Sequence, residues 1–215
     1  LLLIFNFNKI NIEKKEVNDE IYLSGFSGCD NCIGFLSPLV RVYKPHNLAS
    51  TNFADNMANF NNIETYFTSP EITLLKNEAE SFQIAVKNFG VHDFSLDYKI
   101  YFNGVETNEL EIEMYKEEFA NVTYIVYNAV GDRSPMGHYT DPLVSYEKNK
   151  IINSKETVIW WITTRTSENT LVGNYSIKFN VTRDLESDII EVNVSVLNYV
   201  LNNKPKFRAI FNMKF

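Results

Sequence analysis

The chain has 215 residues, of which 45% are hydrophobic and 22% are charged, and its formal net charge is -7. This apolar content excludes a disordered chain and a collagen-like fibre. Asp and Glu (27) outnumber Lys and Arg (20), and no basic cluster interrupts the excess, so we expect no nucleic-acid partner. No run of about 18 apolar residues is present, so we expect no transmembrane segment.

The N-terminal residues differ from the rest of the chain. Residues 1–5 are apolar, begin without Met and precede a polar stretch that ends near Glu20. Two interpretations stay open, the remnant of a signal peptide and an edge strand. We treat 1–20 as a signal-peptide remnant with a polar leader, and 21–215 as a single domain.

The two cysteines, Cys29 and Cys32, lie between glycines. A redox pair needs a helix after the first cysteine, and no amphipathic helix follows. A zinc site needs two further ligands, and the histidines are scattered singly, at His46, His92 and His138. We favour a local disulfide in an oxidising compartment over these two alternatives.

Alternation of apolar and polar residues dominates the chain from residue 70 onward. In 81–88 one face holds Phe82, Ile84 and Val86, which is typical of a half-buried antiparallel strand. The segment 94–102 alternates in the same way. Asn103-Gly104 follows it and predicts a tight hairpin, because both residues accept a positive φ.

Further strands and two long loops complete the predicted fold. Strands are expected over 110–115, 119–129, 156–164, 173–182, 188–199 and 207–211. Irregular loops are expected over the Asn-rich 44–66 and over 131–150. Short amphipathic strands without intervening helices predict an all-β fold, a two-sheet antiparallel β-sandwich of immunoglobulin or jelly-roll type. We expect its core to contain Phe82, Ile84, Val86, Ile177, Phe179, Val192 and Val194.

Four Asn-x-Ser/Thr sequons are present, at Asn121, Asn174, Asn180 and Asn193. Asn174 and Asn180 share the polar face of their predicted strand, and Asn193 lies opposite a stripe of Ile and Val residues. N-glycosylation needs a solvent-facing asparagine. We therefore expect a secreted or extracellular glycoprotein, with the endomembrane lumen as an alternative location.

Several motifs occur in the order of one known family. Lys76–Gln83 (KNEAESFQ) is similar to that family's RNE-x-E-x-FQ strand entry, and 139–144 (YTDPLV) is similar to its pDpLlP loop. Trp161 with 173–177 is similar to lWv-x-i…pGxYxGxi, and 190–207 is similar to the last strand and its exit. Over 65–215 the chain thus resembles the N-terminal β-sandwich of DUF4091-type proteins, relatives of the glycoside hydrolase family 123 N-acetylgalactosaminidases.

The chain departs from the family pattern at three strand ends. Ser145 stands where the loop often ends in Pro, and Thr166-Ser167 replaces Val-Pro after the tryptophan strand. The stretch 200–202 lacks a Leu-Pro step. These departures indicate a distant branch of the family.

The resemblance also implies where the chemistry of such a protein lies. In the family an adjacent Asp-Glu pair, in a (β/α)₈ barrel after the sandwich, helps the substrate's acetamido group to attack the anomeric carbon. No position of this chain matches that motif, so we assign no catalytic residue. We interpret the acidic pairs Asp19-Glu20 and Glu117-Glu118 as solvated surface charge.

The remaining candidate sites are cofactor and metal sites, His138 and the two tryptophans. We expect no cofactor and no metal site, because no phosphate-binding loop, Gly-x-Ser-x-Gly elbow or His-Glu-x-x-His helix is present. We interpret His138 as a polar loop residue. Trp160 and Trp161 must point to opposite faces of one strand. The resemblance assigns Trp161 to the core, which leaves Trp160 as an outward contact for carbohydrate or a neighbouring domain.

Two functional hypotheses follow. The first is a non-catalytic β-sandwich module of a secreted glycoside-hydrolase-like protein, which braces a following catalytic barrel absent from this chain and borders a carbohydrate site. The alternative is a structural or adhesive extracellular domain that acts by protein–protein contact. Whether a full-length protein is a glycosidase stays open, and the expected partners are a downstream domain, another protein, or carbohydrate.

Overall fold

The computed structural model describes residues 33–45, 57–59, 63, 67–87, 90–122, 126–127, 133–134, 137–154 and 157–202. Their regular elements are strands, and these ranges contain no α-helix, hence none that could span a membrane. The predictions for residues 1–20, for the Cys29–Cys32 disulfide and for a strand over 207–211 lie outside the described residues.

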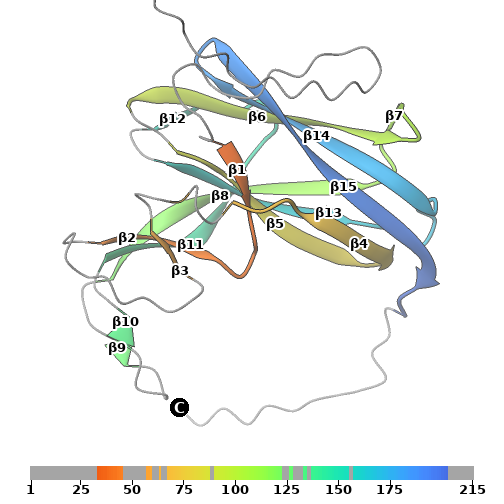
Figure 1. Ribbon diagram of the computed structural model, residues 1–215, viewed down its shortest axis with the longest axis horizontal. Helices are drawn as coiled ribbons and strands as arrows, with labels where there is room; N and C mark the ends of the chain where they lie inside the picture. The colour runs from red at the N-terminus through yellow and green to blue at the C-terminus, as the bar shows by residue number, and fades with distance from the viewer. Residues whose placement is uncertain are drawn as a thin grey trace, which may run out of the picture.

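The strands form two sheets that pack face to face (Figure 1). The first is seven-stranded, in the order β1 (Ile33–Leu36), β5 (Ala79–Val86), β13 (Val158–Arg165), β8 (Glu111–Val122), β11 (Gly137–Ser145), β2 (Arg41–Pro45) and β3 (Met57–Asn59). The second contains, in order, β12 (Ile152–Ser154), β6 (His92–Phe102), β14 (Gly173–Arg183), β15 (Glu186–Val200) and β4 (Glu71–Lys76), with β7 (Val105–Thr107) beside β6. A separate short pair joins β9 (Val126–Tyr127) to β10 (Arg133–Ser134).

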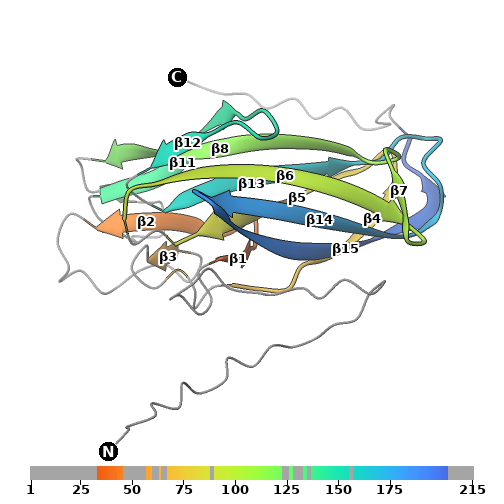
Figure 2. The same ribbon diagram turned by 90° about the horizontal axis from the view of Figure 1, so that it is seen from above.

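The two-sheet β-sandwich predicted from the sequence is confirmed. Figure 2 shows β6, β14 and β15 in one layer and β13 and β11 in the other. The sheets are antiparallel except for one parallel pair in each, β4 with β15 and β2 with β3. The predicted hairpin joins β6 to β7, with Asn103 and Gly104 at φ values of 51° and 80°.

The main core lies between the two sheets, and all seven core residues predicted from the sequence are buried in it. The rings of Phe82 on β5 and Phe179 on β14 meet edge to face at 5.7 Å between centroids. Such a pair joins the sheets by apolar burial and favourable ring geometry. Period-two alternation thus correctly predicted the inner faces of β5, β14 and β15.

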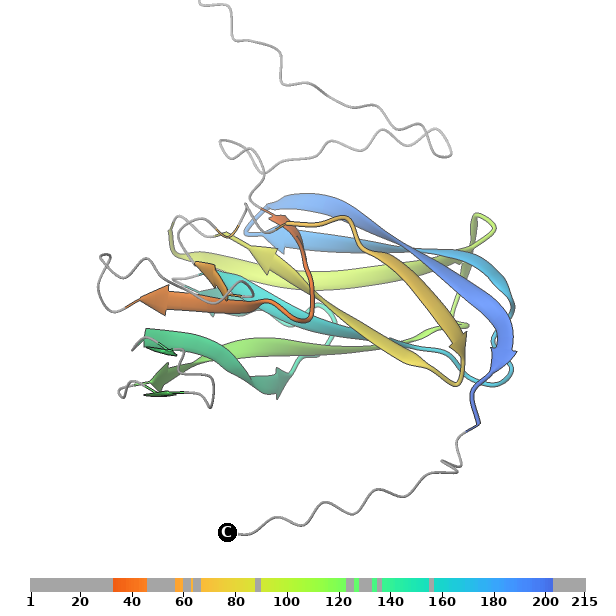
Figure 3. The same ribbon diagram turned by 60° about the horizontal axis from the view of Figure 1, so that its bottom comes forward.

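The chain crosses from one sheet to the other at the corner between β4 and β5. In Figure 3 the golden β4 lies between the yellow β5 and the blue β15. Asn77 turns the corner at φ 64°, and the Glu78 carboxylate accepts the amide of Leu75 at 2.6 Å. The Thr166 hydroxyl donates to Leu75 O (2.6 Å) and accepts the Glu78 amide (3.1 Å). The KNE part of the family-like motif therefore forms a hydrogen-bonded corner.

The two predicted loops need correction. The irregular loop over 131–150 is wrong for Gly137–Ser145, which is strand β11 between β8 and β2. A register shift between Thr140 and Leu143 interrupts the strand, and such a bulge hides the period-two pattern. The predicted loop 44–66 contains strand β3, and Ile63 within it is buried.

A second, smaller cluster covers part of the outer face of the seven-stranded sheet. Ala85 and Ile159 alternate with the main-core residues of β5 and β13, so they point away from that core. They pack with Leu36, Val42 and Ile63. The chain around β1 and β2 thus lies over this end of the sheet and leaves a hollow beside it.

Candidate functional site

The two tryptophans have the opposite arrangement to the one predicted. Trp160 is 0% exposed and belongs to the main core, where it meets Tyr146 edge to face at 6.0 Å. Trp161 is half-buried on the outer face of the seven-stranded sheet. The expectation that Trp160 points outward is wrong, because Trp160 shares its face of β13 with the core residues Val158 and Ile162.

Trp161 borders a surface hollow of about 270 Å³, which we call the Trp161 hollow. Five strands or their connections contribute its walls. The lining comprises Pro38 and Val40 between β1 and β2, Arg41 on β2, Gln83 on β5, Glu117 on β8, Thr140 and Leu143 on β11, and Trp161 on β13. The hollow combines one large aromatic surface, apolar edges and several hydrogen-bonding side chains, which is the usual composition of a small-molecule site.

Gln83 is a buried polar side chain of the hollow that is held by two hydrogen bonds. It is 2% exposed, and its Nε2 donates to Ser37 O at 3.1 Å and to Val40 O at 2.8 Å. Its Oε1 is buried and has no hydrogen-bond partner among the described residues. A buried acceptor left without a donor costs about 1–3 kcal/mol, and a bridging water is the kind of donor that can relieve this cost.

Glu117 was predicted to be solvated surface charge, and this prediction is wrong. Glu117 is 7% exposed and lines the Trp161 hollow together with Arg41. Its neighbour Glu118 points to the opposite face of β8, where it forms an ion pair with Lys116. A strand cannot direct two successive side chains to one side, so only Glu117 belongs to the hollow.

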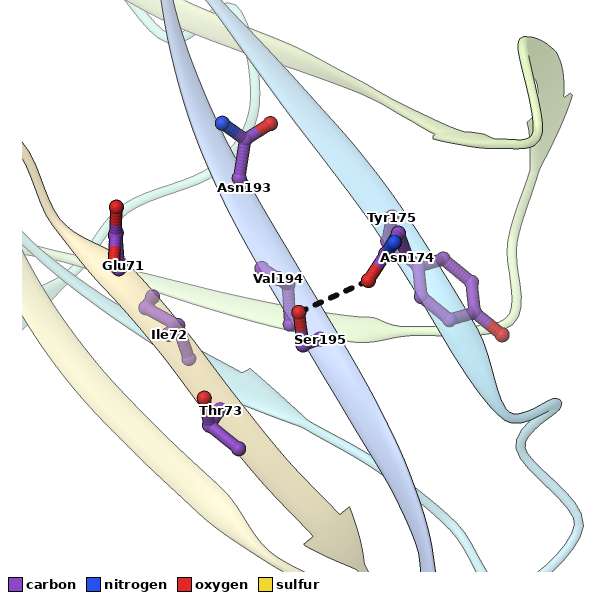
Figure 4. Close-up of a pocket in the computed structure, with 8 residues that line it drawn as sticks. All are labelled: Glu71, Ile72, Thr73, Asn174, Tyr175, Asn193, Val194 and Ser195. Carbon is purple, nitrogen blue, oxygen red and sulfur yellow. Dashed lines mark hydrogen bonds between the residues drawn. The ribbon is translucent and has the colours of Figure 1, made fainter.

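A second hollow, of about 390 Å³, lies across β4, β15 and β14 on the outer face of the other sheet (Figure 4). Asn174 and Asn193, both sequon asparagines, are exposed there. The Ser195 hydroxyl donates to Asn174 Oδ1 at 3.0 Å. The outward side chains of this lining are polar, whereas its apolar members Ile72, Tyr175 and Val194 belong to the main core and are buried, so they offer little apolar surface to a ligand.

The other two sequon asparagines differ from each other. Asn121 is exposed on β8, opposite His138 of β11. Asn180 is half-buried on β14, and its Oδ1 is enclosed without a hydrogen-bond partner among the described residues. Glycan attachment at all four positions stays a prediction.

The histidines do not gather into a site in the described ranges. His138 lies on strand β11, which corrects its placement in a loop. His92 Nδ1 is 2.6 Å from Asp184 Oδ2, in the turn between β14 and β15. No group of three or more His, Cys, Asp or Glu side chains that could hold a metal ion occurs among the residues searched, and His46 lies outside them.

Sequence reasoning missed the outward position of Trp161 although the sequence pattern indicates it. Val158, Trp160 and Ile162 alternate with Trp161, Thr163 and Arg165, so the polar face of the strand carries Trp161. The family resemblance, which places the second tryptophan in the core, overrode this pattern. Gln83 and Glu117 could not be linked to Trp161 without the strand order, because they are far apart in the sequence.

Comparison with known proteins shows the fold. No protein-family model matches the chain, and no curated protein matches it. A similar solved structure is a family 123 glycoside hydrolase from Clostridium perfringens, described as hydrolysing glycolipid glycans, with 19% identity and a TM-score of 0.50. The match covers 66% of this chain and 25% of that one, so this chain spans a quarter of the hydrolase's length.

Two further solved structures, a pilin subunit and a collagen-binding subdomain, are similar at lower TM-scores. The CooA pilin subunit from enterotoxigenic Escherichia coli has 11% identity and a TM-score of 0.29, over 80% of this chain and 99% of that one. The collagen-binding subdomain ACE19 of an Enterococcus faecalis surface protein has 10% identity and a TM-score of 0.29, over 74% and 94%. Similarity at this level supports no argument about function, whereas the match to the hydrolase shows a shared β-sandwich fold.

Proposed function

We propose that this chain is a non-catalytic β-sandwich module of a secreted, glycoside-hydrolase-like protein, and that it braces a catalytic barrel that follows it. The observation that supports the proposal most is the match of 66% of this chain to a quarter of a family 123 glycoside hydrolase. The motifs over 65–215 suggest the same relationship from the sequence. In this proposal the partner is the downstream domain, and the module acts by contact.

The arrangement of carboxylates supports a non-catalytic role. Glycoside hydrolysis by paired carboxylates needs two groups about 5–9.5 Å apart across the scissile bond. The adjacent pair Glu117-Glu118 is split between the two faces of β8, and Glu118 is ion-paired with Lys116. These two carboxylates cannot flank one glycosidic bond.

The proposed extracellular location is supported by the exposure of sequon asparagines. Asn121, Asn174 and Asn193 all reach solvent on folded strands. Secretion would also allow the predicted Cys29–Cys32 disulfide to form. Intact-mass analysis of the native protein, before and after glycosidase treatment and thiol alkylation, tests both modifications.

The activity assay compares this chain with the longer protein that the proposal implies, on chromogenic N-acetylhexosaminides. We expect turnover by the longer protein and none by this chain. Turnover by this chain, lost in Glu117→Gln, would overturn the proposal and make Glu117 catalytic. Turnover by neither protein would overturn it in favour of a structural or adhesive domain.

A further inference from the structure

The Trp161 hollow has a composition that fits one class of ligand. Trp161 supplies a half-buried indole, and Leu143 on β11 supplies an exposed apolar edge. The face of an indole ring is electron-rich and attracts the weakly positive C–H groups of an apolar ligand face. A pyranose ring has such a C–H face, and its hydroxyl groups project around the rim.

The polar groups of the hollow can form hydrogen bonds with the hydroxyl groups around a pyranose ring. Glu117 accepts hydrogen bonds, Arg41 donates them, and Thr140 does both. The Thr140 oxygen already accepts the Val42 amide at 3.3 Å, which fixes its position and leaves its proton to donate. Gln83 adds a buried carbonyl oxygen without a partner among the described residues. Vicinal hydroxyl groups, which both donate and accept, can pair with Glu117, Arg41 and Thr140, and they can pair with the Gln83 oxygen through a bridging water.

The charges and the volume of the Trp161 hollow restrict the class of ligand further. Glu117 and Arg41 bring opposite charges to one hollow, so neither an anion nor a cation is favoured over a neutral ligand. The volume of about 270 Å³ is slightly below the roughly 300–1,000 Å³ of pockets for drug-sized ligands. The hollow is therefore large enough for one sugar ring and too small to enclose an oligosaccharide.

We propose that the Trp161 hollow binds a single neutral pyranose unit of a glycan, stacked on Trp161 and hydrogen-bonded to Glu117, Thr140 and Arg41. The class of ligand rests on the proposed function, whereas the place rests on the geometry of the hollow. One ring on an open surface gives a dissociation constant of about 1 mM or weaker. The site holds a glycan chain beside the catalytic domain without taking part in cleavage.

The test is an NMR titration of the isotopically labelled chain with methyl β-D-galactopyranoside and with its 2-acetamido analogue. The chain has two indole N–H signals, one from buried Trp160 and one from Trp161. We expect a saturable shift of the Trp161 signal and none of the Trp160 signal. Sorbitol, an acyclic polyol, is the ligand control and should shift neither.

The variants locate the site. Trp161→Ala should weaken binding at least about tenfold, and Glu117→Gln, which keeps the side-chain volume, should weaken it several-fold. Tyr199→Ala removes another exposed aromatic ring, 64% exposed on β15, and should leave binding unchanged. Each variant is first shown to be folded by its methyl spectrum, and Glu117→Gln decides the question if Trp161→Ala does not fold.

Three results would overturn the inference: no shift with either glycoside at about 50 mM, well above the expected dissociation constant, an equal shift with sorbitol, or unchanged binding by a folded variant of the hollow. These results are independent of the hydrolysis assay. If this chain binds no glycoside but the longer protein hydrolyses its substrate, the proposed sugar site is wrong and the proposed function stands. If this chain alone hydrolyses the substrate, the proposed function is wrong.

Discussion

Gln83 and Trp161 lie opposite each other on the neighbouring strands β5 and β13. The next pair along the same strands, Ile84 and Trp160, points into the main core. Successive residues of a strand alternate between its faces, so the buried position of Trp160 directs Trp161 outward beside Gln83. This pairing makes the two tryptophans differ in their contribution to stability and in their access to ligand.

We expect Trp160→Ala to lower the free energy of unfolding by about 3–5 kcal/mol, because it leaves a cavity in the core beside Tyr146. The half-buried Trp161 has part of its surface in water already, so Trp161→Ala should cost less than about 2 kcal/mol. Urea unfolding of both variants checks the order. A larger loss for Trp161→Ala would contradict the assignment of the faces.

Tyr146→Phe should destabilise the fold by about 1–3 kcal/mol, because it leaves the buried Leu96 amide and the Lys150 carbonyl without their hydroxyl partner. The Tyr146 hydroxyl accepts the Leu96 amide at 2.9 Å and donates to Lys150 O. It thereby joins β6 of one sheet to the chain that follows β11 of the other. Urea unfolding measures the change, and a loss below about 0.5 kcal/mol would show that water replaces these bonds.

Thr166→Val should cost about 1–3 kcal/mol, because it leaves the Glu78 amide and Leu75 carbonyl without their hydroxyl partner at the β4–β5 corner. Thr166→Ser is the matched control, since it keeps the hydroxyl and loses only a methyl group. The unfolding midpoints of the two variants should therefore differ. Equal losses of stability in the two variants would show that side-chain packing, and not the hydroxyl group, causes the effect.

Asp184 makes stability depend on pH in the acid range. Its pKa lies below the ordinary value because its carboxylate accepts the Asp93 amide at 2.8 Å and, as the smaller effect, pairs with His92. A carboxylate with a lowered pKa in the folded state stabilises the fold above its unfolded pKa, and this contribution is lost as pH falls through the folded pKa.

We therefore expect the wild-type chain to lose more stability than Asp184→Asn between about pH 5 and pH 2. Asparagine is the suitable replacement because residue 184 has a φ of 53°, a conformation that Asn tolerates. Denaturant unfolding across this range gives the two curves. Parallel curves would show that the hydrogen bonds of Asp184 do not persist in solution.

In a eukaryotic secretory host we expect higher glycan occupancy on the exposed Asn121, Asn174 and Asn193 than on Asn180, which is half-buried and whose Oδ1 is enclosed. The glycan is attached to the amide nitrogen and extends into solvent, so a half-buried asparagine on a folded strand hinders its attachment. Glycopeptide mass spectrometry of the folded, secreted chain measures each site. Equal occupancy at all four sites would contradict the expected hindrance at Asn180.

The sandwich could be predicted from the sequence because each inner face follows a local rule. Phe82, Ile84 and Val86 on one strand, and Ile177 and Phe179 on another, alternate with polar neighbours and are all buried. Strand β11 was not predicted, because its bulge between Thr140 and Leu143 interrupts the alternation of apolar and polar residues. Alternation identifies a regular strand and fails where the register shifts.

The Trp161 hollow could not be predicted because it depends on strand order. Gln83, Glu117 and Trp161 come together only because β8 and β5 both pair with β13. Nothing in the local sequence determines these neighbours. The assignment of Trp160 and Trp161 to the wrong faces was a different kind of error. The alternation of apolar and polar residues within β13 already predicts that Trp160 is buried and that Trp161 points outward.

The most direct test of the bracing role is thermal inactivation of the longer protein with and without residues 33–202. If the sandwich braces a catalytic domain, its deletion should shorten the half-life of N-acetylhexosaminidase activity at elevated temperature while the shortened protein keeps its catalytic residues. Adding this chain back in trans should restore part of that half-life. An unchanged half-life after deletion, or hydrolysis by this chain alone, would contradict the account.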